Sequence, residues 1–236
     1  MISICVPMYN ESSIIESTAK TLFEYMSSRY GNDFEIIFSN DGSRDNCADI
    51  VESLALPNVK VVGYEKNQGK GCAVRHAILA SAGDIVIFTD ADLAYGVDVI
   101  SQAVDELHKN EYSAVVASRA LHPNGYEGYT FIRKLASKTY IKALNTLCGI
   151  KISDAQCGFK AFRGDEGRKI FSHCQTNNFA FDLEAILVAQ KMKLKIFEMP
   201  AMIINHRDSK VNVLRDAPKM LKEALAIKKR VKNMEI

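Results

Sequence analysis

Short apolar runs alternate with amphipathic segments along the first half of the chain. The apolar runs are rich in β-branched residues and cover 2–6, 34–39, 59–64, 84–90 and 112–118. Between them, apolar positions at helical spacing predict helices near 12–29, 45–55, 70–82 and 97–109. This alternation predicts an α/β fold with a mostly parallel, Rossmann-like sheet and helices on both faces. The connections between its parallel strands are expected to be right-handed. The runs are continuously apolar, as strands buried on both faces are.

The pattern changes after about residue 120. A loop rich in Gly, Pro and Tyr precedes four further predicted elements, which are helices over 131–148 and 179–192, a strand within 195–204 and a basic helix over about 214–233. We expect one domain over 1–212, with the helical segment 213–236 either part of it or appended to it.

Composition and charge narrow the class of protein. The 236 residues are 47% hydrophobic and 25% charged, which is average for a soluble globular protein. No apolar run approaches the roughly 20 residues of a membrane-spanning helix, and the N-terminus does not resemble a secretion signal, so we expect a cytoplasmic protein. From His206 onward there are nine basic and four acidic residues, against a net charge of +2 overall. A basic tail on a mildly acidic body suggests a local anionic partner and not nucleic acid.

Polar residues follow each of the first four predicted strands, in the segments PMYNE, NDGSRD, KNQGKG and DADL. In open α/β sheets, ligands bind at the carboxyl ends of the strands, so these loops are expected to form one polar site. Neither the dinucleotide fingerprint GxGxxG nor a Walker loop is present. A diphosphate bound here would therefore need a divalent cation to neutralise it.

Asp90 and Asp92 are candidates for holding that cation. They lie two residues apart at the end of an apolar strand and so share a face. Carboxylate oxygens suit Mg²⁺ or Mn²⁺. Taken alone, such a pair is also typical of a helix N-cap beside a solvated loop residue.

These segments, in this order and spacing, resemble the family 2 glycosyltransferases, which have a GT-A nucleotide-sugar fold. The later SDAQCGFKAFR, FDLE and HRDSKV are similar to motifs of polyprenyl-phosphate (dolichyl-phosphate) glycosyltransferases, especially the β-glucosyltransferases and the related mannose synthases. The resemblance covers about residues 2–213 and implies an inverting, metal-dependent enzyme that moves a hexose from a nucleotide sugar to a polyprenyl phosphate.

The resemblance also implies roles for individual residues. The nucleotide-sugar site would be formed by Pro7, Tyr9, Glu11, Asp41, Lys70, Asp90, Ala91 and Asp92. Asp90 and Asp92 would hold Mg²⁺ or Mn²⁺. Asp154 and Gln156 belong to an acceptor-facing motif and join Asp92 as catalytic candidates. The acceptor phosphate would be bound by Arg133, Lys160, Arg207 and Lys210, each of which could also be a solvated surface charge.

Two departures from the family pattern bear on the donor. Asn40 stands where the family usually has an acid, and an amide can still hydrogen-bond a base. Leu93 follows the DxD element where mannosyl members often have a polar residue, which favours UDP-glucose over GDP-mannose.

The sequence leaves open which acceptor the protein uses and whether it contacts a membrane. A phosphate monoester has a second pKa near ~6 and needs no general base, whereas a hydroxyl acceptor would make Asp154 the leading base candidate. A non-catalytic nucleotide-sugar-binding module is the other alternative. The basic C-terminal helix either contacts the inner face of a membrane peripherally or packs on the domain with a solvated basic face. A separate membrane protein could also present the lipid.

Overall fold

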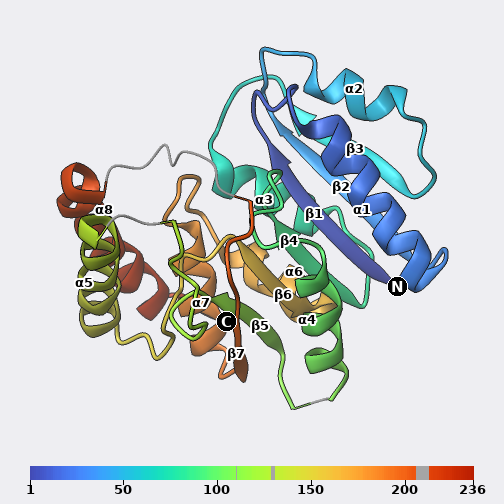
Figure 1. The fold of residues 1–236 in the computed structure, drawn as a ribbon. Coiled ribbons are helices and arrows are strands. Elements are labelled where there is room, and N and C mark those ends of the chain that lie inside the picture. The colour runs from blue at the N-terminus through green and yellow to red at the C-terminus, as the bar shows by residue number, and fades with distance from the viewer. Residues whose placement is uncertain (110, 129–130, 206–212) are drawn as a thin grey trace.

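The computed structural model describes residues 1–109, 111–128, 131–205 and 213–236. Its centre is a seven-stranded sheet in the order β3-β2-β1-β4-β6-β5-β7 (Figure 1). The strands are β1 (Ile2–Met8), β2 (Phe34–Asp41), β3 (Val59–Tyr64), β4 (Ile85–Thr89), β5 (Ala114–Ser118), β6 (Phe159–Arg163) and β7 (Ile196–Pro200). The first five match the predicted apolar runs to within a few residues.

The sheet is parallel except at β6. Strands β3, β2, β1 and β4 pair in parallel, as do β5 and β7, whereas β6 runs antiparallel between β4 and β5. Because β6 runs in the opposite direction, its first residue, Phe159, lies opposite Thr89 at the end of β4. The segment that leads into β6 therefore reaches the edge where the parallel strands end.

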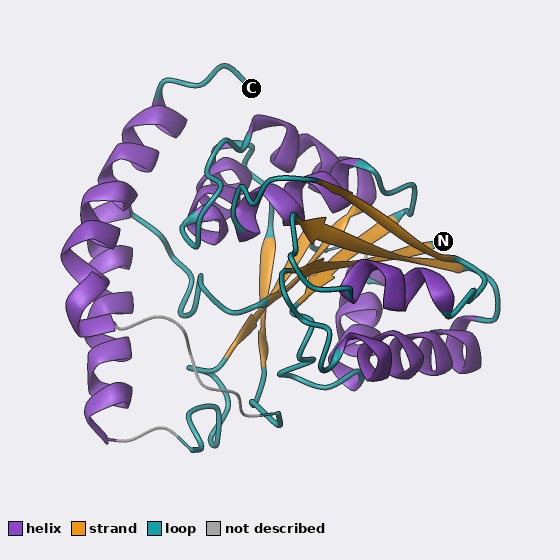
Figure 2. Ribbon diagram, turned by 90° about the horizontal axis from the view of Figure 1, so that it is seen from above, coloured by secondary structure: helices purple, strands orange, loops and turns teal. Residues whose placement is uncertain are grey.

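Helices cover both faces of the sheet (Figure 2). They are α1 (Ile15–Tyr30), α2 (Cys47–Ser53), α3 (Lys70–Leu79), α4 (Asp98–His108), α5 (Phe131–Cys148), α6 (Gly164–His173), α7 (Phe181–Lys191) and α8 (Val213–Lys232). The sequence pattern did not predict α6. No helix in the described ranges combines the length and apolar character needed to cross a bilayer.

Each central strand contributes to two hydrophobic cores because successive side chains of a strand point to opposite faces. In β1, Ile4 and Val6 join the core under α1, α2 and α4, while Cys5 joins the core under α3, α6 and α7. Burial on both faces explains why these strands are apolar at consecutive positions.

The C-terminal helix α8 packs on α5 and α7 through one apolar side. Ala224, Ile227 and Val231 are nearly inaccessible to solvent. The buried Glu184 of α7 accepts bonds from Arg230 Nε (3.0 Å) and Nη2 (2.6 Å). Its other oxygen accepts bonds from the backbone N–H groups of residues 175 and 176. Glu184 thus joins α8 to the loop before α7.

The first prediction concerns this anchor. Glu184→Ala leaves the Arg230 guanidinium and two backbone N–H groups, one of them buried, without their acceptor, so we expect it to lower the free energy of unfolding by about 2–4 kcal/mol. Urea denaturation followed by circular dichroism measures the change. Glu223→Ala is the matched control, because Glu223 lies on α8 and accepts a bond from the exposed Asn178 side chain. We expect a loss of about 1 kcal/mol or less for the control, and equal losses for the two variants would contradict the anchoring role.

Candidate active site

The loops after β1 and β2 are held together by hydrogen bonds. The Asn10 N–H donates to Ser43 Oγ (3.1 Å), and the Arg44 N–H donates back to Asn10 Oδ1 (2.8 Å). The Ser12 N–H donates to Asp45 Oδ2 (2.8 Å). Between them stand the predicted donor-site residues Tyr9 and Glu11, both half-buried, while Pro7 is buried within β1. Hydrogen bonds therefore join the two predicted loops along one side of the candidate site.

Asp41, at the end of β2, organises the loop between β3 and α3. Tyr64 Oη donates to its Oδ1 (2.7 Å) and Asn67 Nδ2 to its Oδ2 (2.8 Å). The N–H groups of Gln68 and Gly69 donate to the same carboxylate at 2.8–3.1 Å. Both oxygens of Asp41 thus hold the KNQGKG loop in place, a contact that the sequence motif did not indicate.

Gly69 lets this loop meet the second half of the chain. Its φ is +102°, and a Cβ built there would lie 2.4 Å from the Asn177 carbonyl oxygen. The Gly71 N–H donates to that oxygen (2.8 Å). Close packing at this point brings the start of α3 next to the loop before α7.

Lys70, the first residue of α3, forms an ion pair with Asp90, which follows β4. Lys70 Nζ lies 2.5 Å from the buried Asp90 Oδ1. Burial lowers the pKa of Lys70, but the carboxylates of Asp90 and Asp182 raise it by more, so it lies above its ordinary value. Gly158 provides room for this carboxylate, since a Cβ there would lie 2.3 Å from Asp90 Oδ2.

A second, deeper ion pair lies beneath the first. Lys160 of β6 is fully buried and contacts the Asp182 carboxylate at the start of α7. It also donates to the Cys157 carbonyl (2.8 Å) and lies 5.2 Å from the centre of the Phe88 ring. Burial raises the pKa of Asp182 above its ordinary value, although Lys160 and Lys70 act to lower it. Lys160 therefore lies under the site, whereas sequence reasoning placed it at the acceptor phosphate.

Asp92 lies in the turn after β4. Its Oδ1 accepts a bond from the Ala94 N–H (3.1 Å), and Ala91 beside it is buried. In the part of the chain that the structure describes, no group of three or more His, Cys, Asp or Glu side chains could enclose a metal ion.

The donor atoms at this turn fit Mg²⁺ or Mn²⁺. Both predicted ligands, Asp90 and Asp92, supply hard carboxylate oxygens, and Asp90 Oδ1 is buried with Lys70 as its polar contact among the described residues. Two carboxylates suffice for such an ion, which keeps water and takes further oxygens from phosphates. The residues present are therefore compatible with a cation bound together with a diphosphate.

Asp154 and Arg119 form a buried pair at the end of β5. Asp154 is inaccessible to solvent, and its oxygens accept bonds from Arg119 Nε (2.6 Å) and Nη2 (2.9 Å). This two-pronged contact fixes the guanidinium, whose carbon lies 5.9 Å from the centre of the Tyr126 ring. Arg119 was not among the predicted residues, because a lone Arg after an apolar run gives no signal of its own.

The remaining predicted residues are less constrained. The half-buried Gln156 side chain makes no hydrogen bond to the residues that the structure describes. The backbone of Arg133 lies in the first turn of α5, while its side chain is outside the description. Arg207 and Lys210 lie outside the described residues. The acceptor-side assignments of these residues stay predictions.

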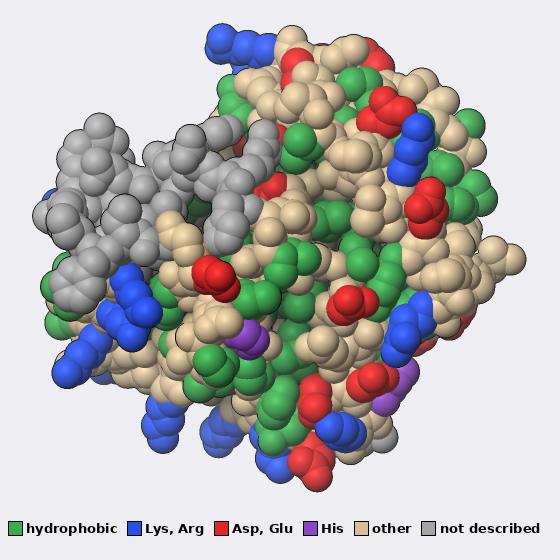
Figure 3. All heavy atoms as spheres, in the orientation of Figure 1, with side chains coloured by type: hydrophobic (Ala, Val, Ile, Leu, Met, Phe, Trp, Pro, Cys, Tyr) green, Lys and Arg blue, Asp and Glu red, His purple; other side chains and the backbone are tan. Residues whose placement is uncertain are grey.

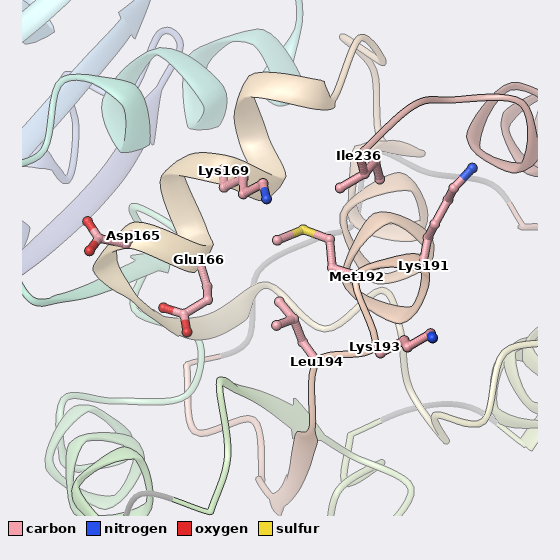
Figure 4. A pocket seen from close by; sticks show the side chains of 8 residues that line it. All are labelled: Asp165, Glu166, Lys169, Lys191, Met192, Lys193, Leu194 and Ile236. Atoms are coloured by element: carbon pink, nitrogen blue, oxygen red, sulfur yellow. The ribbon is translucent and has the colours of Figure 1, made fainter.

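A surface crevice elsewhere contains none of the predicted residues. It is lined by Asp165, Glu166, Lys169, Lys191, Met192, Lys193, Leu194 and Ile236 (Figure 4). These side chains come from α6, the end of α7 and the C-terminus. The candidate site is therefore defined by the converging strand ends and not by this crevice.

Comparison with known proteins gives concordant matches. The family model for glycosyl transferase family 2 matches residues 3–168. A dolichyl-phosphate beta-glucosyltransferase of Trichomonas vaginalis is 33% identical over 221 residues, covering 88% of this chain and 65% of the relative. The corresponding enzyme of Dictyostelium discoideum is 29% identical over 240 residues, covering 96% of this chain and 73% of the relative.

A solved structure shares the fold. Glucosyl-3-phosphoglycerate synthase from Mycobacterium tuberculosis, crystallised with Mn²⁺, UDP-glucose and phosphoglyceric acid, superposes with a TM-score of 0.69 at 19% identity. The match covers 100% of this chain and 81% of that one. The likeness confirms the prediction of a GT-A-type α/β fold.

The second prediction concerns the buried pair under the site. Asp182→Ala leaves the Lys160 ammonium buried without its counterion, so we expect it to lower the free energy of unfolding by about 3–5 kcal/mol. The double variant Lys160→Met/Asp182→Leu removes both charges and should recover most of that loss. Urea denaturation measures both. A double variant no more stable than the single one would show that the pairing is not what stabilises this region.

Proposed function

The chain belongs to glycosyl transferase family 2, and we propose that it transfers glucose from UDP-glucose to a polyprenyl phosphate, with inversion and with a divalent cation. The observation that carries the proposal is the convergence of Lys70, Asp90 and Asp92 at the carboxyl edge of the sheet, beside the loops after β1 and β2. The Lys70 ammonium can bind a diphosphate, and the carboxylates of Asp90 and Asp92 can bind the cation that accompanies it.

The relatives support the substrates. The two relatives compared above are named dolichyl-phosphate beta-glucosyltransferases, and this chain spans 65% and 73% of their lengths. The structural neighbour binds Mn²⁺ with UDP-glucose. Leu93 after the DxD element agrees with a glucosyl donor.

The proposed reaction is a single displacement at the anomeric carbon. An oxygen of the acceptor phosphate attacks that carbon, the bond from the carbon to the diphosphate oxygen breaks, and UDP leaves with the bonding electron pair. The acceptor oxygen is already ionised near neutral pH, because the second pKa of a phosphate monoester is about 6. No side chain is then required to remove a proton.

The chief task of the protein is to bring two anions together. Like charges 4 Å apart repel by about 4 kcal/mol at an effective dielectric constant of 20. In this proposal Lys70, which lies beside Asp90, offsets the charge on the donor diphosphate. The Arg119 guanidinium, which Asp154 holds in position, offsets the charge on the acceptor phosphate. Asp90 and Asp92 would hold Mg²⁺ or Mn²⁺, which when bound neutralises charge on the departing diphosphate.

The state of Asp154 favours a phosphate acceptor over a hydroxyl acceptor. A general base must reach the proton that it removes. Asp154 is buried and both its oxygens are occupied by Arg119. These contacts support a role for Asp154 in orienting Arg119. An oriented guanidinium can bind a phosphate acceptor, but it cannot remove a proton from a sugar hydroxyl.

The third prediction tests the reaction. The purified protein with UDP-[¹⁴C]glucose, undecaprenyl phosphate and Mn²⁺ should yield label that partitions into an organic phase. EDTA, or the substitution Asp92→Asn, should reduce the rate at least about 100-fold, because the diphosphate would lose its main neutralising partner. Label found only on a soluble saccharide acceptor, or a rate unaffected by EDTA, would contradict the proposal. GDP-mannose in place of the donor serves as the specificity control.

We also propose that α5 and α8 contact an anionic membrane surface, where the lipid acceptor resides. Leu135 of α5 and Leu225 of α8 are 57% and 46% exposed. Exposed lysines surround them on the same two helices, namely Lys138, Lys142, Lys222, Lys229 and Lys232. Basic side chains are visible over α5 in Figure 3. Each such cation contributes about 1 kcal/mol near an anionic bilayer.

The fourth prediction tests this contact by sedimentation with lipid vesicles. The protein should co-sediment with vesicles containing phosphatidylglycerol and not with pure phosphatidylcholine, because the attraction depends on negative surface charge. Reversing the charge of Lys222, Lys229 and Lys232 to Glu should abolish co-sedimentation. The control reverses three exposed lysines elsewhere, Lys169, Lys193 and Lys195, with the same change in net charge. Equal loss in both triple variants would exclude a docking face on α8.

A further inference from the structure

The turn that carries Asp92 has a backbone conformation that needs support. Leu93 has a φ of +47°, in the left-handed region that non-glycine residues rarely adopt. Its N–H donates to the Asp90 carbonyl (3.0 Å), and its own carbonyl accepts a bond from the Gly96 N–H (2.8 Å). Such residues persist where the surrounding structure holds them, and they cluster at functional sites.

A distant segment supplies part of that support. Asn205 Nδ2 donates to the carbonyl of Leu93 (3.0 Å) and to that of Asp92 (3.3 Å). The backbone N–H groups of Ile204 (2.8 Å) and Asn205 (3.3 Å) both donate to the Ala94 carbonyl. One short segment after β7 thus bonds three successive carbonyls of the turn.

The surroundings keep this contact in one position. The segment leaves β7 beside β5, where the Ala201 N–H donates to the Ser118 carbonyl (3.0 Å). The Ile204 side chain packs against Gly96, where an added Cβ would lie 2.6 Å from Ile204 Cδ1. Asn205 itself is exposed, so its side-chain bonds act on the turn and not on a hydrophobic core.

We propose that Asn205 is a positioning residue that holds the Asp92 turn in the conformation that binds a divalent cation together with a nucleoside diphosphate. The backbone dihedrals of the turn set the direction in which the Asp92 side chain leaves the backbone. The bonds from Asn205 to the carbonyls of Asp92 and Leu93 hold those dihedrals, while the Ala94 N–H donates to the carboxylate itself. The inference rests on the proposed function, because it assumes that Asp92 meets a cation and a diphosphate.

Calorimetric titration with UDP, in the presence of Mn²⁺ and separately in EDTA, tests the proposal. Asn205→Ala removes both side-chain bonds, and Asn205→Leu removes them while keeping a similar side-chain size. We expect each variant to weaken UDP binding with Mn²⁺ about fivefold or more, as loss of a net hydrogen bond would, and to change binding in EDTA less than about twofold.

Asn145→Ala is the matched control. Asn145 Nδ2 also donates to a backbone carbonyl, that of Ile152 (2.6 Å), but in α5 and away from the Asp92 turn. The control should bind UDP as the wild type does under both conditions. Melting temperatures measured for every variant report on the fold.

Four results would overturn the proposal. Asn205 variants that bind UDP and Mn²⁺ within twofold of the wild type would show that the turn holds without them. Equal weakening with and without Mn²⁺, or in the Asn145 control as well, would show a general structural effect. If the wild-type protein binds no UDP with Mn²⁺, the proposed function itself is refuted. That outcome differs from one in which the wild type binds UDP and only the role of Asn205 fails.

Discussion

The pairing of opposite charges at the end of β4 is the constraint on which the rest of the site depends. Asp90 meets Lys70 at the surface of the site, and Asp182 meets Lys160 beneath it. Buried charges are costly unless they are paired, so the elements that supply them must be brought to one place. These four residues come from α3, the end of β4, β6 and the start of α7. Their pairing therefore couples both halves of the chain to a single polar centre.

The loops around this centre are held by hydrogen bonds and by close packing of the backbone. Asp41 uses both carboxylate oxygens to fix the loop before α3, and Gly69 and Gly158 allow backbone and carboxylate to approach where a Cβ would collide. The DxD turn is fixed from its other side by the segment after β7. A rigid arrangement of this kind suits a reaction in which positioning and charge neutralisation provide most of the rate acceleration.

Asp154 and Lys160 show how burial changes the meaning of a charged residue. Both occur in the segment SDAQCGFKAFR, and both are inaccessible to solvent. Asp154 forms an ion pair with Arg119, and Lys160 forms one with Asp182. The charge of these two residues suggests contact with substrate, whereas in the structure both make their ionic contacts inside the fold.

The sequence by itself determined the fold class, the first five strands and the four polar loops, because apolar periodicity and strand-end position are local properties of the chain. Its motifs also identified the family, which the comparisons confirm. Helix α6 and the contacts of Arg119, Asp182 and Asn205 were decided only by the tertiary structure. Each of those contacts joins residues far apart in the chain, and the antiparallel insertion of β6 is what places Lys160 and Gly158 beside β4. Such pairings depend on which strands become neighbours, and no local pattern records that.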